Sequence, residues 1–152
     1  MLKNSKVISG LQEIVTGLSQ QAVGHMIQSR IFASQGFSKL AEKYAEHAEE
    51  EQKYVVLCID RLLDLGADVK NEAKQETPIR KDIVEWLKYD LKISKEGLPW
   101  LAEIIEAAKC DLSTFDMLKD YYKDEEEDMY WAEQQLELIE KIGLQNWLAR
   151  QI

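Results

Sequence analysis

Residues Ser38 to Leu65 read SKLAEKYAEHAEEEQKYVVLCIDRLLDL, a segment without glycine or proline. Apolar side chains recur along it at spacings of three and four, which places them on one side of an α-helix. Most of the stability of such a helix comes from packing its apolar side against other helices. The segment therefore predicts one long helix of a bundle, with Glu51 in the middle of its apolar stripe.

Three other segments show the same helical spacing. The first runs from about Ser5 to Ser34, the next begins near Asp82, and the last ends at Gly143. Leu144 to Ile152 predict a short separate helix. Pro99 is expected to kink the third long helix, because proline removes a backbone donor.

The ends of these helices are marked by capping residues. Ser38 is the expected N-cap of the second helix and Gly66 its C′ residue, while Asp111 or Ser113 can cap the fourth helix. The polar stretch from Ala67 to Pro78 is too long for a tight turn, and a crossover of that length lets the second and third helices run parallel. The expected fold is all-α, with residues 1–152 forming a single domain.

Composition agrees with this fold class. The chain has 152 residues, of which 45% are hydrophobic, and this size supports a core without disulfides or metals. Two prolines and seven glycines are too few for the many turns of a β-sandwich or barrel. Cys58 and Cys110 lack the close spacing of a zinc site, so both are expected to be reduced.

The charge balance narrows the partners. Against 28 acidic residues stand 19 basic ones, a net charge of -9. Lys3 and Lys6 near the N-terminus make no basic stripe, so nucleic-acid binding is not expected, whereas cations are attracted. No apolar run reaches the ~20 residues that cross a bilayer, and Met1 to Gly10 lack a secretory signal, so we expect a cytoplasmic protein without a membrane partner.

Polar residues interrupt the apolar stripes near the middle of each long helix. Buried carboxylates are costly unless they are paired, hydrogen-bonded or bound to a metal, so the cluster is the candidate functional site. Its members are Gln21, His25, Glu51, Tyr54, Ser94, Glu125 and Asp128.

Several stretches resemble the bacterioferritins. The strongest are Ile59 to Leu63 (IDRLL), Asp124 to Glu126 (DEE), and Leu138 to Leu148 (LIEKIGLQNWL), which is followed by Gln151 and Ile152. The resemblance covers nearly the whole chain. It implies a ferritin-like four-helix bundle with a long crossover between helices 2 and 3 and a short C-terminal helix, in subunits that dimerise and assemble into an iron-storing shell.

The resemblance also implies a di-iron ferroxidase centre, built in that family from one Glu on each of two helices and a Glu-x-x-His pair on each of the others. Two of the six ligands are kept, as Glu51 and Glu125. The other four positions hold Leu18, Tyr54, Ser94 and Asp128. By this comparison the centre is degenerate, and ferroxidase activity is expected to be weak or absent.

Haem is not expected either. The family binds haem through a methionine from each subunit of a dimer, and that position holds Gln52 here. Met26 is interpreted as a core or interface residue. His25 stands where the family usually has a tyrosine beside the centre.

Two states of the cluster remain open. In one, a single iron, manganese or zinc ion is bound by oxygen and nitrogen ligands from Glu51, Glu125, Asp128 and His25. In the other, the core is metal-free: protonated His25 pairs with Glu51 and Glu125, while Tyr54 and Ser94 donate hydrogen bonds.

The favoured function is an iron-binding or iron-storage shell subunit that associates with itself. Either mineral forms passively on inward-facing carboxylates such as Glu46, Glu49 or Glu50, or the subunit co-assembles with an active paralogue. The alternatives are a non-storage scaffold or dimer, and a protein with a remodelled single-metal site.

Overall fold

The protein is an all-helical bundle in a computed structural model that describes residues 4–152. Lys3, which entered the charge argument, lies outside the described residues. The helices are α1 (Ser5–Ser34), α2 (Ser38–Asp64), α3 (Ile83–Ala107), α4 (Leu112–Ile142) and α5 (Leu144–Ala149). The predicted all-α class, the four long helices and the short C-terminal helix are confirmed.

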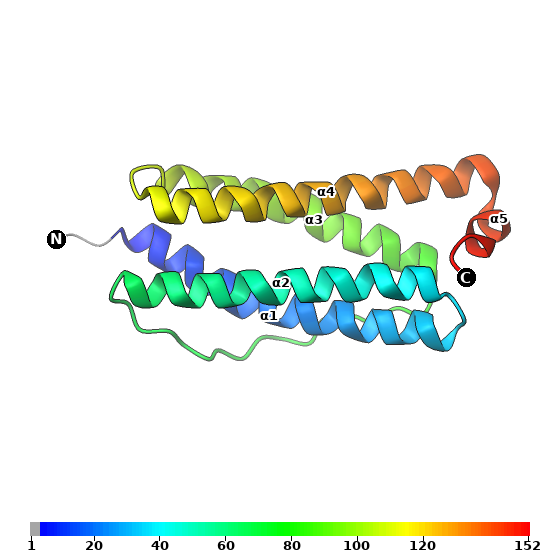
Figure 1. The fold of residues 1–152 in the computed structure, drawn as a ribbon, viewed down its shortest axis with the longest axis horizontal. Coiled ribbons are helices and arrows are strands. Elements are labelled where there is room, and N and C mark those ends of the chain that lie inside the picture. Colours follow the sequence, from blue (N-terminus) through cyan, green and yellow to red (C-terminus); the bar gives the residue numbers. More distant parts are fainter. Residues whose placement is uncertain (1–3) are drawn as a thin grey trace.

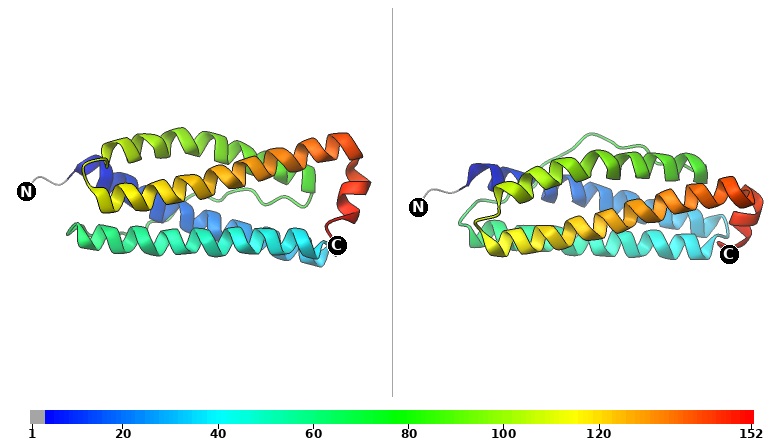
Figure 2. Two further views of the ribbon diagram at one scale, coloured as in Figure 1. Left: turned by 45° about the horizontal axis from the view of Figure 1, so that its top comes forward. Right: turned by 90° about the horizontal axis from the view of Figure 1, so that it is seen from above.

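The helices pair as two antiparallel hairpins, α1 with α2 and α3 with α4. After α2 the chain returns along the length of the bundle, so α3 starts near the end at which α2 began (Figure 1). Helices α2 and α3 therefore run parallel, as the long polar stretch predicted. α5 turns across one end of the bundle (Figure 2).

Side-chain amides of α1 hold the crossover in place. Gln12 donates to the carbonyl oxygen of Lys70 at 3.0 Å and accepts from its backbone nitrogen at 2.9 Å. Gln28, which is fully buried, makes the same pair of bonds to Arg80, both 2.9 Å long. Each amide satisfies one backbone donor and one acceptor of a segment without regular structure. Hydrogen bonds from α1 thus hold the crossover in place, although the crossover forms no helix or strand itself.

The helix ends differ from the sequence predictions at one point. Phe37, not Ser38, occupies the N-cap of α2, without a side-chain capping bond. Phe37 packs against an apolar cluster of the core, and this contact fixes the start of the helix. Gly66 has a φ of 74° after the C-cap, so its predicted role is confirmed. Asp111 caps α4 by accepting from the backbone nitrogen of Thr114.

α3 continues from Ile83 to Ala107 through Pro99, which lies on the exposed side of the helix. Its path is bowed in the left view of Figure 2.

Two apolar clusters fill the bundle, one toward each end. The first cluster includes Leu11, Leu18, Cys58, Leu101, Ile104 and Leu118. The second includes Phe32, Leu40, Tyr44, Trp86, Leu87 and Trp147. Trp147 comes from α5 and donates its indole proton to Gln135 at 2.9 Å. The buried polar side chains His25, His47, Glu51 and Asp90 belong to neither cluster and form a polar layer within the bundle.

The close approach of α1 and α3 makes a stability prediction. A Cβ atom added to Gly10 would lie 2.7 Å from Cγ2 of Ile104, whereas one added to Gly97 meets nothing within 4 Å. Gly10→Ala should therefore destabilise the fold by about 1–3 kcal/mol through overpacking. Gly97→Ala, the control, should stabilise it by about 0.5–1 kcal/mol, because alanine favours helix more than glycine. Urea unfolding of both variants measures the difference, and equal effects would contradict this packing.

Candidate metal centre

His25 is the central residue of the polar layer. Its Nδ1 lies 2.5 Å from Oε1 of Glu51, and its Nε2 lies 2.7 Å from Oδ1 of Asp90. All three side chains are buried, and they come from α1, α2 and α3. His25 and Asp90 are 65 residues apart in the sequence, and their contact holds α1 and α3 at the same level of the bundle.

Charge decides the protonation of His25. Burial alone lowers the pKa of this imidazole, but the carboxylates of Asp90 and Glu51 outweigh it and raise the pKa well above 6.5. With a carboxylate at each ring nitrogen, the metal-free side chain is an imidazolium that donates on both sides. Burial raises the pKa of Glu51, although His25 acts against that shift.

His47 lies beside His25 in a very different state. The two rings meet edge to face with their centres 5.7 Å apart, and His47 also contacts the rings of Tyr44 and Trp131. Burial and the charge of His25 lower the pKa of His47 to about 3. Its Nε2 is 3.3 Å from Oδ1 of Asp128 on α4, without the geometry of a hydrogen bond. His47 is thus a neutral imidazole.

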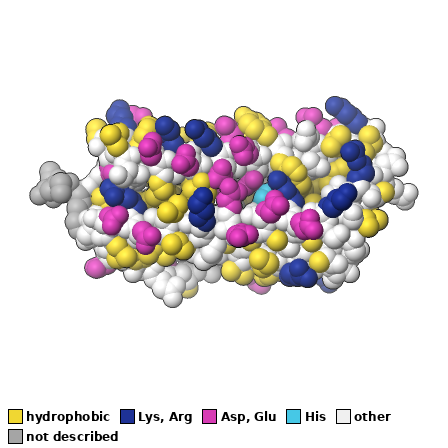
Figure 3. Space-filling model, in the orientation of Figure 1, with side chains coloured by type: hydrophobic (Ala, Val, Ile, Leu, Met, Phe, Trp, Pro, Cys, Tyr) yellow, Lys and Arg dark blue, Asp and Glu magenta, His cyan; other side chains and the backbone are white. Residues whose placement is uncertain are grey.

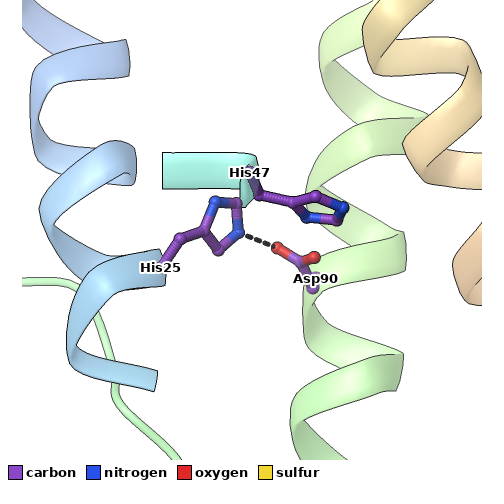
Figure 4. A group of neighbouring side chains, drawn as sticks. All are labelled: His25, His47 and Asp90. Atoms are coloured by element: carbon purple, nitrogen blue, oxygen red, sulfur yellow. Dashed lines mark hydrogen bonds and ion pairs between the residues drawn. The ribbon is translucent and has the colours of Figure 1, made fainter. Parts of the chain in front are cut away.

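His25, His47 and Asp90 converge on one point. One ligand atom from each lies within 4.8 Å of those of the other two. Figure 4 shows the two imidazoles facing each other across the end of the Asp90 carboxylate, each side chain carried by a different helix. Two nitrogen donors and a carboxylate at this spacing make a candidate site for a transition-metal ion.

One side chain of the layer lacks hydrogen-bond partners. Within residues 4–152, neither ring nitrogen of His47 makes a hydrogen bond, while Gln21 is the nearest amide to Glu51 and Trp86 the nearest donor to Tyr44. Buried polar groups are nearly always satisfied in native proteins, because leaving one unpaired costs roughly 1–3 kcal/mol. The polar layer therefore has buried nitrogen atoms that are free to bind a further hydrogen-bond donor or a metal ion.

The predicted site residues separate into two groups. His25 and Glu51 are in direct contact, and Asp128 lies 3.3 Å from His47, near enough for the charges of Glu51 and His25 to act on it. Glu125 makes no hydrogen bond or ion pair with the described residues. Together with Leu18 and Ser94, it lines a cleft of about 560 Å³ that opens between α1, α3 and the crossover.

Tyr54 corrects one expectation. It was expected to donate a hydrogen bond within the metal-free core, but its hydroxyl donates to Asp124 at 2.5 Å, nearer the surface. Its ring packs at a tilt against Tyr121, with the ring centres 5.0 Å apart, and joins the first apolar cluster. Tyr54 therefore turns away from His25 and Glu51.

Sequence reasoning missed His47 and Asp90. Each lies four residues before a residue that was identified, His47 before Glu51 and Asp90 before Ser94. Because side chains four apart share one face of a helix, that spacing was the available signal.

Acidic side chains crowd the outer side of the layer. Figure 3 shows them gathered over the middle of this face, around the visible surface of a histidine. Burial and the charges of Glu50 and Glu51 raise the pKa of Asp128 to about 7. Burial and Asp124 raise the pKa of Glu50 to about 7 as well. The face between α2 and α4 therefore has a strongly negative potential.

A second opening reaches the layer from the opposite side. A cleft of about 130 Å³ between α1, α3 and the crossover is lined by His25, Asp90 and Trp86. It is large enough for several water molecules, so a hydrated ion has a route to these residues.

The chain is similar in sequence to known proteins over most of its length. The ferritin-like domain family matches residues 8–142. A bacterial ferritin of Synechocystis sp. is 34% identical, over 96% of each chain, and one of Neisseria meningitidis serogroup B is 34% identical over all of both chains. A bacterioferritin of Streptomyces coelicolor is 24% identical over 94% of this chain and 87% of its own. Within the described residues, no helix combines the length and apolarity that a membrane span needs.

Asp128 gives a pH prediction for the metal-free protein. Its folded pKa of about 7 lies above the ordinary 3.8, so between these pH values the folded chain keeps a proton that the unfolded chain has lost. The stability of the fold therefore falls as the pH rises from about 4 to about 7. Asp128→Asn removes that loss. In the presence of a chelator, the variant should exceed the native chain in stability by about 1–3 kcal/mol at pH 8 and by much less at pH 4.

Urea unfolding at one protein concentration measures this difference. Asp60→Asn on the exposed side of α2 is the control for net charge alone. A gain that is equal at both pH values, or shared by the control, would show that the field around Asp128 is not the cause.

Proposed function

The chain belongs to the ferritin-like family, and from that premise we propose that it is a cytoplasmic, single-domain iron-storage subunit without a working ferroxidase centre of its own. One observation carries this proposal. Leu18, at a position where the family has a metal-binding Glu, is 3% exposed and packs in the first apolar cluster. A leucine there offers no atom that can bind a metal ion, even though it borders the larger cleft.

The remaining ligand positions support the same conclusion. Ser94 lines the cleft with a side chain too short to replace a carboxylate, and the Tyr54 hydroxyl is engaged by Asp124. Glu51 is engaged by His25. These residues do not fit a pair of bridged iron ions, so no oxidation step through such a centre is derived for this chain.

Iron can still be a substrate of the acidic face between α2 and α4. Glu46 is exposed on α2, and Glu50, one turn farther along the helix, is half-buried beside Asp124, whereas Glu49 lines a groove between α1 and α2 instead. Carboxylates held close together attract cations, and the raised pKa of Glu50 reflects their mutual repulsion. In this proposal ferrous ions collect on that face, and the ferric mineral grows from it.

Storage in a shell requires self-association, and one face supports it. Val23, Met26 and Val56 are exposed around a groove of about 610 Å³ between α1 and α2. Ile27 and Leu63 are exposed apolar residues of the same two helices. We assign this face to a second copy of the chain, because apolar groups gathered in this way are stabilised by burial.

The same groove bears on haem. Gln52 and Met26 both line it, so Met26 is not a core residue. A glutamine amide is a poor replacement for the thioether that holds haem iron in this family, and we propose that the dimer forms without haem.

An oxidising partner completes the proposal. A subunit that lacks ferroxidase ligands can contribute storage surface in a shell whose other subunits, from an active paralogue, oxidise the iron. The chemistry required of that partner is rapid oxidation of ferrous ions.

Ferrous oxidation tests the missing centre. With two ferrous ions added per chain, the native protein should show no rapid oxidation phase. Glu51→Ala should leave the remaining slow rate of ferrous oxidation unchanged. The fourfold variant Leu18→Glu, Tyr54→His, Ser94→Glu, Asp128→His restores the family ligands and should gain a phase at least about tenfold faster, since metal-centred catalysis depends on a complete ligand set. Stopped-flow absorbance of ferric species measures both.

Larger additions of iron separate storage from scaffold function. A subunit that stores iron should form a slow mineral core that co-migrates with the assembly. A rapid phase in the native protein would refute the degenerate centre, and a failure to retain iron, alone or with an active paralogue, would favour the scaffold alternative.

The proposed dimer face gives a further prediction. Val56→Glu places a charge in the apolar groove and should shift the protein from an assembly toward single chains, because a buried unpaired carboxylate is costly. Leu112→Glu changes an exposed leucine at the start of α4 and is the matched control. Light scattering measures both masses. An unchanged assembly in Val56→Glu would exclude this face as the contact.

A further inference from the structure

We propose that His25, His47 and Asp90 form a resident site for one borderline divalent metal ion of the zinc class, separate from the position of the family's di-iron centre. The site is additional to iron storage and does not depend on it.

The donor set selects the class of ion. Two imidazoles with a carboxylate suit zinc and similar transition metals, whereas magnesium and calcium prefer oxygen ligands alone. Tetrahedral coordination with bonds of about 2.0–2.1 Å puts ligand atoms about 3.4 Å apart. The three atoms here lie within 4.8 Å of one another, so shifts on the order of 1 Å complete the geometry.

The unpartnered atoms are an independent sign of a ligand. His47 is 3% exposed, and within the described residues its ring nitrogens make no hydrogen bond. Burying the His47 ring without a hydrogen bond costs free energy, and a bond to a metal ion would offset that cost.

The neighbouring carboxylates orient and neutralise the site. Glu51 holds one nitrogen of His25 at 2.5 Å, as carboxylates commonly do for metal-binding histidines. Asp128 stands 3.3 Å from His47 and can turn either to the ring or to the ion. Three carboxylates from α2, α3 and α4 thus surround the place of a doubly charged ion, which offsets most of their negative charge.

The site adjoins the family centre, with Glu51 and Asp128 next to both, but its ligands His47 and Asp90 lie about one helical turn from family positions. His47 precedes Glu51, and Asp90 precedes Ser94, by four residues each, or roughly 6 Å of helix. The cleft of about 130 Å³ lined by His25 and Asp90 provides the entry path.

Zinc binding by the assembled, chelator-stripped protein tests the proposal. The protein is dialysed against a low free concentration of Zn²⁺ in millimolar Mg²⁺, which occupies exposed carboxylates. Elemental analysis should then find about one zinc per chain. His47→Gln and Asp90→Asn should each bind at least about tenfold more weakly. Glu13→Gln, which changes an exposed carboxylate of the larger cleft, is the matched control and should retain the ion. Substitution by Co²⁺ should give the visible absorption of a histidine-bound ion, lost in His47→Gln.

Three results would overturn the site: no zinc in the native protein, full zinc in both variants, or loss of zinc in Glu13→Gln. Far-UV circular dichroism verifies that each variant is folded, and Asp90→Asn, a change of nearly equal size, decides the question if His47→Gln unfolds. Iron uptake by the same preparations tests storage separately, since stoichiometric zinc without iron retention would sink only the storage proposal.

Discussion

The His25 imidazole, held at both nitrogens by carboxylates from two other helices, sets the arrangement of the bundle's centre. Apolar helix faces pack against each other with some freedom to slide, because the hydrophobic effect has no direction. A buried imidazolium has no such freedom, since the loss of either carboxylate would leave charge unpaired in the interior. The bonds to Glu51 and Asp90 therefore fix α1, α2 and α3 at one height. His47 and Asp128 make the corresponding approach between α2 and α4.

The same constraint bears on how polar side chains are distributed along the bundle. Helical periodicity lets a polar side chain move by four residues and stay on the inner face. Here Leu18 belongs to the apolar cluster and Ser94 borders a cleft, whereas the histidines lie one turn farther along the bundle. The fold tolerates this exchange because each level needs only a filled volume and satisfied polar groups.

The acidity of the chain has two structural roles. Some carboxylates are bound inside, where Glu51 and Asp90 balance His25. Others crowd the face between α2 and α4, where repulsion and partial burial raise the pKa of Asp128 and Glu50 to about 7. Both groups lower the electrostatic cost of bringing in cations, so a net charge of -9 is expressed as a directed field rather than as uniform surface charge.

The sequence by itself determined the helices, the long crossover with its parallel α2 and α3, and the burial of His25 and Glu51, because periodicity and punctuation are local properties of the chain. It did not determine that Phe37 would begin α2, that Tyr54 would turn to Asp124, or that His47 and Asp90 would join His25. Those outcomes depend on the height and rotation of each helix relative to its neighbours. Periodicity assigns a residue to a face, but only tertiary packing decides which side chains, as far apart as His25 and Asp90, meet across the core.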